Sequence, residues 1–386
     1  MQIRKKSLLR DRVLTILAFL LLFILLKFSK SMFSNGSYVI RVLNQSAIYA
    51  ISALGLNLIN GFAGQFSLGQ AGFMAIGGYV TAILSLDATT KTMLYSLDPI
   101  QPWLLHVELP FIIALIAAGC VAAIFAFLIG FPVLRLRGDY LAIASLGFAE
   151  IIRVIITKMP TITNGALGLK NLKSIPSLFK GVPLLGAIFG ESQMTIFLIL
   201  ILAVVFLNRL MKTSYGRTIK AVRDDEIAAQ AMGVNLFSRK MTAFVLSGFL
   251  AGIAGGLLAG LIGAVDPEQY KYILTYNILL MVVLGGMGSN SGSVLGAFIV
   301  TIALEVLRVV DDPINFGFFK YPGISGMRMV IFSALLMLVI IFWNRGIFAA
   351  KEFSWHWLFG RLQKVKRVFS RDKQEAEGNQ GKGSGA

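Results

Sequence analysis

Few residues in this sequence have the side chains and the spacing that catalysis or metal binding requires. The chain has two histidines, His106 and His356, and one cysteine, Cys120. Neither histidine has a cluster of carboxylates or thiols near it in the sequence, so we predict no metal site. A single cysteine cannot form an internal disulfide, and Cys120 lies in an apolar run, where a thiol acts as a small apolar residue. The sequence therefore indicates no catalytic site, no metal and no cofactor.

Two glycine-rich segments place polar side chains among apolar ones. The first, NGFAGQFSLGQAGFMAIGGY, covers residues 60–79, and the second, GGMGSNSGSVLG, covers 285–296. Small residues let helices approach closely in lipid, whereas polar groups at membrane depth tend to face a cavity or a pathway. Both interpretations, helix packing and a translocation pathway, stay open for these residues: Gly61, Gly64, Gln65, Ser67, Gln70, Gly285, Gly286 and Gly288.

The most charged internal stretch is Tyr215–Lys240. Asp224 and Asp225 are expected to cap a short helix over residues 226–232, which Gly233 would terminate. A short helix with a small face suits docking into a groove of another protein, but it is equally typical of an amphipathic connector. The expected contact face carries Ile227, Ala228, Ala229, Ala231 and Met232.

The elements that position these residues follow from composition. The chain has 386 residues, of which 56% are hydrophobic and only 14% charged, whereas soluble domains carry about 25% charged residues. The apolar residues form long blocks such as Leu14–Leu26, which with its flanks approaches the ~20 residues that cross a bilayer. Because lipid offers no partners to backbone groups, these blocks must be helical. The predicted fold is an all-α, polytopic transmembrane helical bundle.

We predict ten helices, of which about eight to ten span the membrane. The first is taken as a membrane helix rather than a signal peptide, because no small-residue cleavage site follows it. The two helices around GGMGSNSG are close together, so one of them need not span fully. The predicted ranges are 13–29, 38–60, 66–86, 106–132, 139–157, 194–211, 241–263, 274–287, 292–310 and 326–343.

Basic residues predict the orientation. Segments 1–12, 133–138, 212–240 and 344–386 hold 22 of the 36 Lys and Arg residues, whereas the connections on the opposite side hold nine. Since cytoplasmic loops are enriched in Lys and Arg, both termini are expected in the cytoplasm. The net charge of +17 is thus explained by topology rather than by nucleic-acid binding. We expect a cytoplasmic N-terminus (1–12), a transmembrane domain (13–343) containing a cytoplasmic loop (212–240), and a disordered basic tail (344–386).

Ionisable residues within the apolar segments are few. Glu150 and Arg153 are three residues apart, and Glu305 and Arg308 repeat that spacing. Each pair could form an ion pair on one helix face, which suits anchoring between helices or at the interface. A secondary carrier working without an ATPase would be expected to have more carboxylates, and a membrane-embedded enzyme would need a clustered site. Both alternatives are therefore disfavoured.

A weak internal similarity suggests two halves. Segments 130–143 and 263–274 each link a helix rich in alanine and glycine to the next helix, with a tyrosine shortly before the new helix. The count of basic residues puts the two links on opposite sides of the membrane. An inverted repeat would produce that arrangement.

Several motifs in order resemble a known family. ALGLNLINGFAGQFSLGQAGFMAIGGY (53–79), RLRGDYLAIASLGFAEIIRV (135–154), SYGRTIKAVRDDEIAAQAMGVN (214–235), VVLGGMGSNSGSVLGA (282–297) and GMRMVIFSALLMLVIIF (326–342) are similar to permease subunits of branched-chain amino acid ABC importers, the M-type in particular. The resemblance covers roughly residues 40–345. Urea and short-amide permeases have similar motifs, so an importer for those solutes is an alternative.

The resemblance implies a complex that imports small polar solutes. It would contain this chain, a second permease subunit, two ABC ATPase subunits that hydrolyse ATP, and an extracytoplasmic substrate-binding protein, in the inner membrane of a bacterial cell. The segment from 217 to 233 would be the coupling helix that contacts an ATPase. The residues implied in coupling are Arg217, Asp225, Glu226, Ala228, Ala229 and Gly233.

Overall fold

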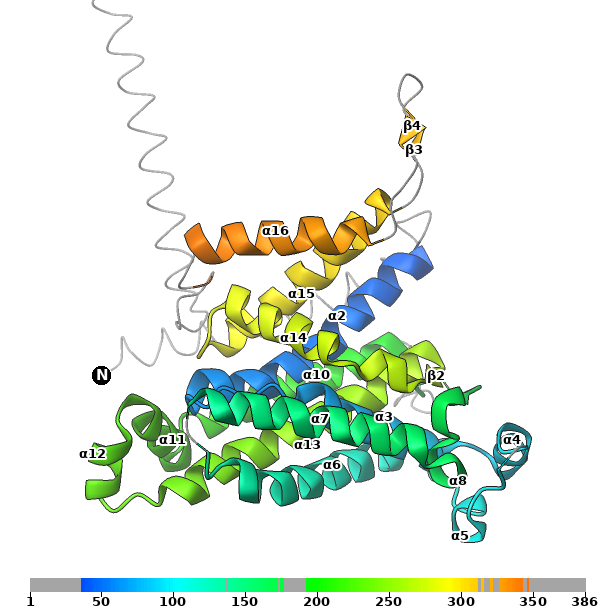
Figure 1. The fold of residues 1–386 in the computed structure, drawn as a ribbon, viewed down its shortest axis with the longest axis horizontal. Coiled ribbons are helices and arrows are strands. Elements are labelled where there is room, and N and C mark those ends of the chain that lie inside the picture. Colours follow the sequence, from blue (N-terminus) through cyan, green and yellow to red (C-terminus); the bar gives the residue numbers. More distant parts are fainter. Residues whose placement is uncertain are drawn as a thin grey trace, which may run out of the picture. The chain divides into compact units, whose positions relative to one another are not determined.

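The apolar runs of the sequence fold into long helices in the computed structural model (Figure 1). The structure describes residues 36–96, 98–136, 138–172, 174–176, 192–311, 314–315, 320–321, 326–342 and 346. All of them belong to one compact unit, Phe23–Lys351. The predicted N-terminal segment, the helix expected at 13–29 and all of the expected tail except Gly346 lie outside the described residues.

The helices expected from residue 38 to residue 343 are all present. The long helices are α2 (Gly36–Asn57), α3 (Gln70–Ser85), α6 (Phe111–Val133), α7 (Asp139–Lys158), α10 (Ser192–Leu210), α13 (Leu236–Ile262), α14 (Tyr272–Gly285), α15 (Asn290–Val306) and α16 (Met327–Phe342). A π-helical turn, η1 (Leu58–Phe62), continues α2.

Shorter elements connect the long helices. The short helices are α4 (Ala88–Leu94), α5 (Pro102–Leu105), α8 (Pro160–Thr163), α11 (Ser214–Asp224) and α12 (Glu226–Ala231), with 3-10 turns η2 (Gly165–Leu167), η3 (Pro267–Tyr270) and η4 (Leu307–Val310). Strands β1 (Leu169–Lys170) and β2 (Ala264–Val265) pair antiparallel, with Leu169 opposite Val265. Strands β3 (Ile314–Asn315) and β4 (Lys320–Tyr321) form a second antiparallel pair.

Five of the described helices are long and apolar enough to cross a membrane. They are α6, α7, α10, α13 and the continuous helix Tyr38–Phe62, and a sixth span is possible if α3 and α4, bent by 119°, are counted together. Helices α14 and α15 are apolar but shorter, in keeping with the expectation that the helices around GGMGSNSG need not both span. The protein is thus an all-α, multi-pass membrane protein, and the total of eight to ten spans stays a prediction.

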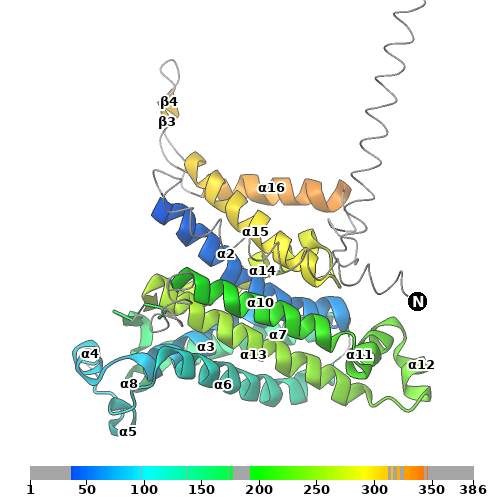
Figure 2. The same ribbon diagram turned by 180° about the vertical axis from the view of Figure 1, so that it is seen from behind.

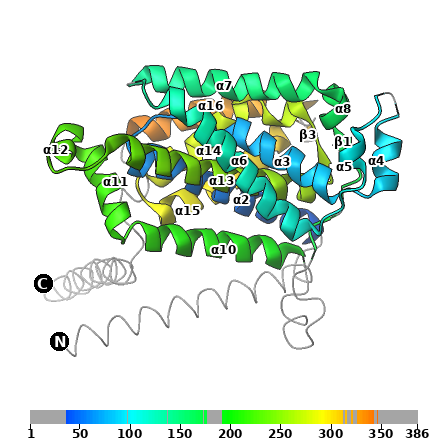
Figure 3. The ribbon, with the colours of Figure 1, turned by 90° about the horizontal axis from the view of Figure 1, so that it is seen from below.

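Helix α13 lies at the centre of the packing. It packs against α6, α3 and α2, and α2 and α13 are the most deeply buried of the long apolar helices. Seen from below, α7 and α10 flank the helices between them (Figure 3). Helix α6 is apolar on all sides and turns Ile116, Ile124 and Leu128 outward, with Cys120 also exposed. Such a surface suits lipid or a neighbouring subunit.

Glycines bring α3 and α13 into backbone contact. A Cβ at Gly77 would lie 2.0 Å from the carbonyl oxygen of Gly252, and a Cβ at Gly255 would lie 1.9 Å from the carbonyl oxygen of Met74. No larger residue fits either position without separating the helices. Close backbone approach through small residues is a principal source of helix association in lipid.

The links 130–143 and 263–274 lie at opposite ends of α7. The first leads from α6 into the start of α7, where Asp139 shares a cavity with Glu226 of α12. The second contains β2, which pairs with β1 beyond the far end of α7; Figure 2 shows α11 and α12 at one end of the helices and α4, α5 and α8 at the other. The links are thus at opposite ends of α7, while their positions on opposite sides of the membrane and the inverted repeat stay predictions.

We predict that Gly255→Ala destabilises the bundle by about 1–3 kcal/mol, the usual range for overpacking, because the added methyl group meets the Met74 carbonyl. The measurement is the thermal unfolding midpoint of the detergent-purified protein. Gly147→Ala in α7 is the matched control, since among the described residues no side chain and no backbone outside its own helical turn lies within 4 Å of its Cβ position. The control should gain up to about 1 kcal/mol from helix propensity; equal midpoints for the two variants would contradict the packing argument.

Candidate functional site

Two interrupted helices meet at their breaks. The first break is the non-helical segment 63–69 between η1 and α3, and the second is the turn between α14 and α15. The Asn57 side-chain oxygen accepts a hydrogen bond from the Gly288 backbone N–H at 2.8 Å. A Cβ at Gly61 would lie only 2.4 Å from the Gly288 nitrogen. The two glycine-rich segments identified in the sequence therefore pack directly against each other.

Side-chain oxygens accept hydrogen bonds from the backbone N–H groups at the first break. The Ser67 N–H donates to Asn60 Oδ1 at 3.1 Å, and the Leu68 N–H donates to Ser145 Oγ of α7 at 2.8 Å. At the start of α3, the Ala71 N–H donates to Thr275 Oγ1 of α14 at 2.9 Å. An apolar interior offers no other partners to these donors, so three helices hold the unwound segment in one conformation.

Gln70 joins three helices. Its Nε2 donates to the Ser52 carbonyl oxygen of α2 at 2.9 Å, and its Oε1 accepts from Ser247 Oγ of α13 at 3.2 Å. The side chain is almost fully buried. Its amide thus holds neighbouring helices together. Ser67 makes local hydrogen bonds: its N–H donates to Asn60 Oδ1, and its Oγ accepts from the Gly69 N–H at 3.4 Å.

The glycines of the second break make its turn possible. Gly286 and Gly288 have φ angles of 106° and 85°, a region that favours glycine. A Cβ at Gly285 would lie 2.1 Å from the Gly292 carbonyl oxygen, so α14 and α15 touch there. Ser289 then caps α15 by accepting from the Gly292 N–H at 3.1 Å.

Helix α12 forms as the sequence predicts. Asp225 accepts from the N–H groups of Ile227 and Ala228 at 2.8 and 3.0 Å, and Gly233, with φ of 78°, terminates the helix. Asp224 was also expected to cap α12, but it ends α11 and pairs with Arg223 at 2.8 Å. Arg217 holds the start of α11 by donating to the Lys212 carbonyl at 3.1 Å and to Ser214 Oγ at 3.0 Å.

The exposed face of α12 differs from the expected one. Ala229 is only 6% exposed, so its placement on a contact face was wrong. The reason is geometric: a single short helix must turn one face inward, and the small Ala229 is the residue that allows close packing. Ile227 and Met232 are 82% and 84% exposed, and Ala228 is exposed beside them. Large apolar side chains exposed at the tip of a helical hairpin are typical of a protein contact.

Arg223 connects α11 to the first break. Its Nη1 donates to the Gly61 carbonyl oxygen of η1 at 3.0 Å. The next glycine, Gly64, has φ of 67°, and a Cβ there would lie 2.6 Å from Arg223 Cγ. The α11–α12 hairpin therefore rests on the same segment that meets the α14–α15 turn.

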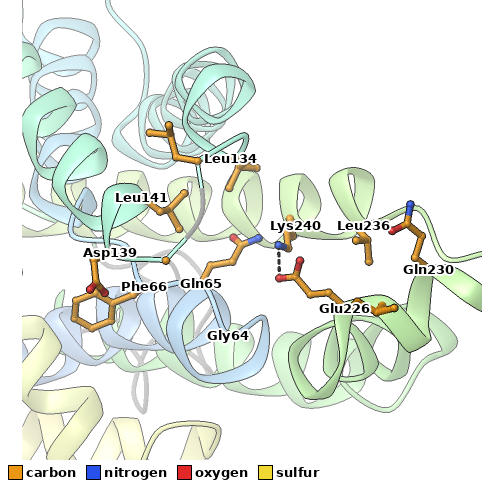
Figure 4. A pocket seen from close by; sticks show the side chains of 13 residues that line it. Gly64, Gln65, Phe66, Leu134, Asp139, Leu141, Glu226, Gln230, Leu236 and Lys240 are labelled. Atoms are coloured by element: carbon orange, nitrogen blue, oxygen red, sulfur yellow. Dashed lines mark hydrogen bonds and ion pairs between the residues drawn. The ribbon is translucent and has the colours of Figure 1, made fainter.

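A cavity of about 410 Å³ lies between the first break, the α6–α7 turn and α12 (Figure 4). Glu226 and Lys240 form an ion pair across one side of it, with Lys240 Nζ 2.5 Å from Glu226 Oε1. Gln65 also lines the cavity and is 5% exposed. Neither side-chain polar atom of Gln65 has a hydrogen-bond partner among the residues that the structure describes. Leaving a buried polar group without a partner costs about 1–3 kcal/mol.

Sequence reasoning missed several residues of this arrangement. Asn57 and Asn60 accept hydrogen bonds from backbone N–H groups of the two breaks, and they could have been noticed as two amides three residues apart just before Gly61. Helix α11 could have been found from Ile219 and Val222, which are three residues apart and both buried. No local signal points to Arg223, because its partner Gly61 is 162 residues away.

The ion pairs expected within helices are confirmed. Arg153 Nε donates to Glu150 Oε1 at 2.8 Å, and the same guanidinium lies 3.6 Å from Glu268 of η3. Arg308 lies 3.2 Å from Glu305. The described residues contain no group of three or more His, Cys, Asp or Glu side chains that could hold a metal ion.

Comparison with known proteins identifies the family. The model of the family described as the branched-chain amino acid transport system permease component matches residues 38–342. The chain belongs to this family. That span runs from the start of α2 to the end of α16, so it includes both helix breaks and the α11–α12 hairpin.

Individual relatives agree. The chain is 34% identical over 336 residues to the high-affinity branched-chain amino acid transport system permease protein LivM of Salmonella typhimurium, covering 82% of this chain and 71% of LivM. It is 27% identical to the probable LivM permease of Methanocaldococcus jannaschii, covering 79% of this chain and 91% of that protein. LivH of Salmonella typhimurium is 24% identical, with 79% and 92% covered. No solved structure matches the chain significantly. The protein is therefore a transport component and a permease.

We predict that Gly64→Ala destabilises this permease more than Gly263→Ala, by about 1–3 kcal/mol. Both glycines have positive φ, 67° and 77°, so both alanines carry a similar backbone cost of roughly 1–2 kcal/mol. Only the Cβ at Gly64 meets another residue, Arg223; no other heavy atom of the described residues lies within 4 Å of that at Gly263. Thermal unfolding of the purified variants measures the difference, and Arg223→Ala should partly rescue Gly64→Ala. Lack of rescue would contradict the contact.

Proposed function

We propose that this chain is the M-type permease subunit of an ABC importer for branched-chain amino acids. The observation that carries the proposal is the match to LivM over 336 residues, 82% of this chain, at 34% identity. The relatives also include LivH, a second permease protein named for the same kind of transport system in the same organism. This supports a partnership with a different, LivH-like permease, so that substrate crosses between the two subunits.

The proposed complex further contains two ABC ATPase subunits and an extracytoplasmic substrate-binding protein. The α11–α12 hairpin lies in the loop 212–240, and the Lys and Arg content of this loop supports a cytoplasmic position for it and for both termini. Its exposed Ile227 and Met232 would insert into a groove of an ATPase subunit. Lipid surrounds the outer faces of the bundle, and a bacterial cell membrane is the proposed location.

The coupling step would run through Arg223. When the ATPase subunits close on ATP, they move α12, and α11 moves with it. Arg223 carries that motion to the Gly61 carbonyl of η1 at 3.0 Å. Gly61 packs on Gly288, so both breaks can respond together. Glycines in positive-φ conformations suit such a hinge, because they change backbone angles at low cost.

We predict that Ile227→Glu combined with Met232→Glu releases the ATPase subunits. Both side chains are exposed in the permease alone, so the change should leave its folding within about 0.5 kcal/mol of wild type, as for ordinary surface substitutions. Two carboxylates buried at the contact would be strongly unfavourable. The measurement is co-purification of ATPase subunits with the tagged permease, followed by leucine uptake.

The control for this prediction is Leu167→Glu, an exposed apolar residue in η2 at the other end of the bundle. It should keep the ATPase subunits bound whether or not it affects the binding protein. Full ATPase co-purification with the Ile227→Glu, Met232→Glu variant would remove α12 from the proposed contact. Uptake of acetamide or urea in preference to leucine would favour the short-amide alternative.

We predict that Arg223→Lys uncouples transport from ATP hydrolysis. Lysine keeps the charge but loses the planar fork that contacts the Gly61 carbonyl and Asp224 together. Uptake should fall about tenfold or more, matching the loss of a charged hydrogen bond of roughly 1.5–3 kcal/mol, while ATPase subunits stay bound and hydrolyse ATP. Arg209→Lys, at the exposed end of α10, is the matched control. Parallel loss of uptake and hydrolysis would argue against a transmitting role.

A further inference from the structure

The cavity beside α12 has the features of a binding site rather than of loose packing. Its volume of about 410 Å³ lies in the range of about 300–1,000 Å³ that small-molecule sites occupy. The Gln65 amide is almost fully buried and has no partner among the described residues, yet it points into this space (Figure 4). Buried polar groups are normally satisfied, so the bonds that this amide lacks must come from whatever fills the cavity, either water or a polar ligand.

The charges of the cavity define the chemistry of that ligand. Among the described residues that line it are two carboxylates, Asp139 and Glu226, and one ammonium, Lys240, which is paired with Glu226. In Figure 4 Asp139 and Glu226 lie on either side of the Gln65 side chain. An ammonium group on a small molecule would pair with the Asp139 carboxylate. A carboxylate on the same molecule would accept from Lys240 and from the Gln65 amide nitrogen.

Apolar side chains complete the wall. Leu134 and Leu141 come from the α6–α7 region, and Leu236 comes from the start of α13. They offer an apolar surface beside the charged groups, which suits a ligand with a short hydrocarbon side chain and would disfavour a fully polar one.

We propose that this cavity binds a free amino acid with an apolar side chain, taken from the cytoplasm. The proposal rests on the proposed function, in which α12 lies on the cytoplasmic side of the membrane. The ligand would lie between Gln65 of the first break and α12, which contributes Glu226, Ile227 and Gln230 to the wall. Occupancy would brace α12 against the α6–α7 turn and resist the motion that coupling needs. Accumulated product would thereby slow its own import.

The binding test uses the complete importer complex in nanodiscs without its binding protein, and L-leucine as the probe. Equilibrium binding of leucine should be saturable. Two analogues should bind with at least about tenfold lower affinity than leucine: isocaproate, which lacks the ammonium, and leucinamide, which lacks the carboxylate. Gln65→Leu and Lys240→Met should each weaken leucine binding by about tenfold or more. Lys212→Met, which removes an exposed lysine outside the cavity, should leave it unchanged.

Gln65→Leu separates a ligand role from a structural one. Because the amide has no partner among the described residues, the leucine variant should unfold at the same temperature as wild type or higher while losing affinity. A lower midpoint together with lost affinity would mean that Gln65 supports the fold, and would overturn the assignment. Leucine binding that is absent in wild type, or unchanged in Gln65→Leu and Lys240→Met, would overturn it as well.

The regulatory part is tested in proteoliposomes that carry the binding protein inside and the ATPase subunits outside. Leucine added on the ATPase side should inhibit ATP hydrolysis, and Lys240→Met should shift the half-inhibiting concentration upward about tenfold. Absence of ATP-driven leucine transport, with leucine binding intact, would refute the proposed function and leave the site standing. Active transport without leucine binding or inhibition would refute the site alone.

Discussion

The structure depends on one constraint: backbone that leaves a helix inside an apolar bundle must find its hydrogen bonds within the protein. The chain unwinds between η1 and α3, and the N–H groups there are met by Asn60, Ser145 and, at the start of α3, Thr275. The second break, between α14 and α15, is fixed to the first by Asn57 and Gly288. The first break thus depends on α2 with η1, on α7 and on α14, and the second depends on its contact with Asn57. Both breaks are therefore sensitive to displacement of the neighbouring helices.

Because the breaks are sensitive to displacement, a movement of the α11–α12 hairpin can affect both of them. A surface hairpin usually contacts only the outside of a bundle, but Arg223 reaches the Gly61 carbonyl and packs against Gly64. Gly61 in turn contacts the Gly288 backbone. A partner that moves α12 therefore acts on both breaks through a short chain of direct contacts. Energetic coupling of this kind requires an element that can adopt two arrangements. Glycines at positive φ give the breaks the backbone freedom that such an element needs.

Two glutamines of the first glycine-rich segment have different environments although they look alike in the sequence. Gln70 has its amide bonded on both sides, to Ser52 and Ser247, and holds three helices together. Gln65, five positions earlier, is equally buried but faces a cavity with no partner for its amide among the described residues. The same side chain is a crosslink at one position and a group open to a ligand at the other, because unwinding of 63–69 turns Gln65 away from the helix interfaces.

The long helices between residues 38 and 343, the capping of α12 by Asp225, the ion pairs at i and i+3 and the family resemblance could all be predicted from the sequence. Each of these rests on local spacing or on hydrophobicity over a short window, and lipid leaves an apolar run no alternative to a helix. Three further features became apparent only in the folded protein: Ala229 faces inward, Arg223 contacts Gly61, and Gln65 rather than Gln70 faces a cavity. These depend on which residues from distant parts of the chain share a contact: Arg223 and Gly61 are 162 positions apart, and Asn57 and Gly288 are 231 apart. Contacts at such separations are set by packing of whole helices, which no local pattern records.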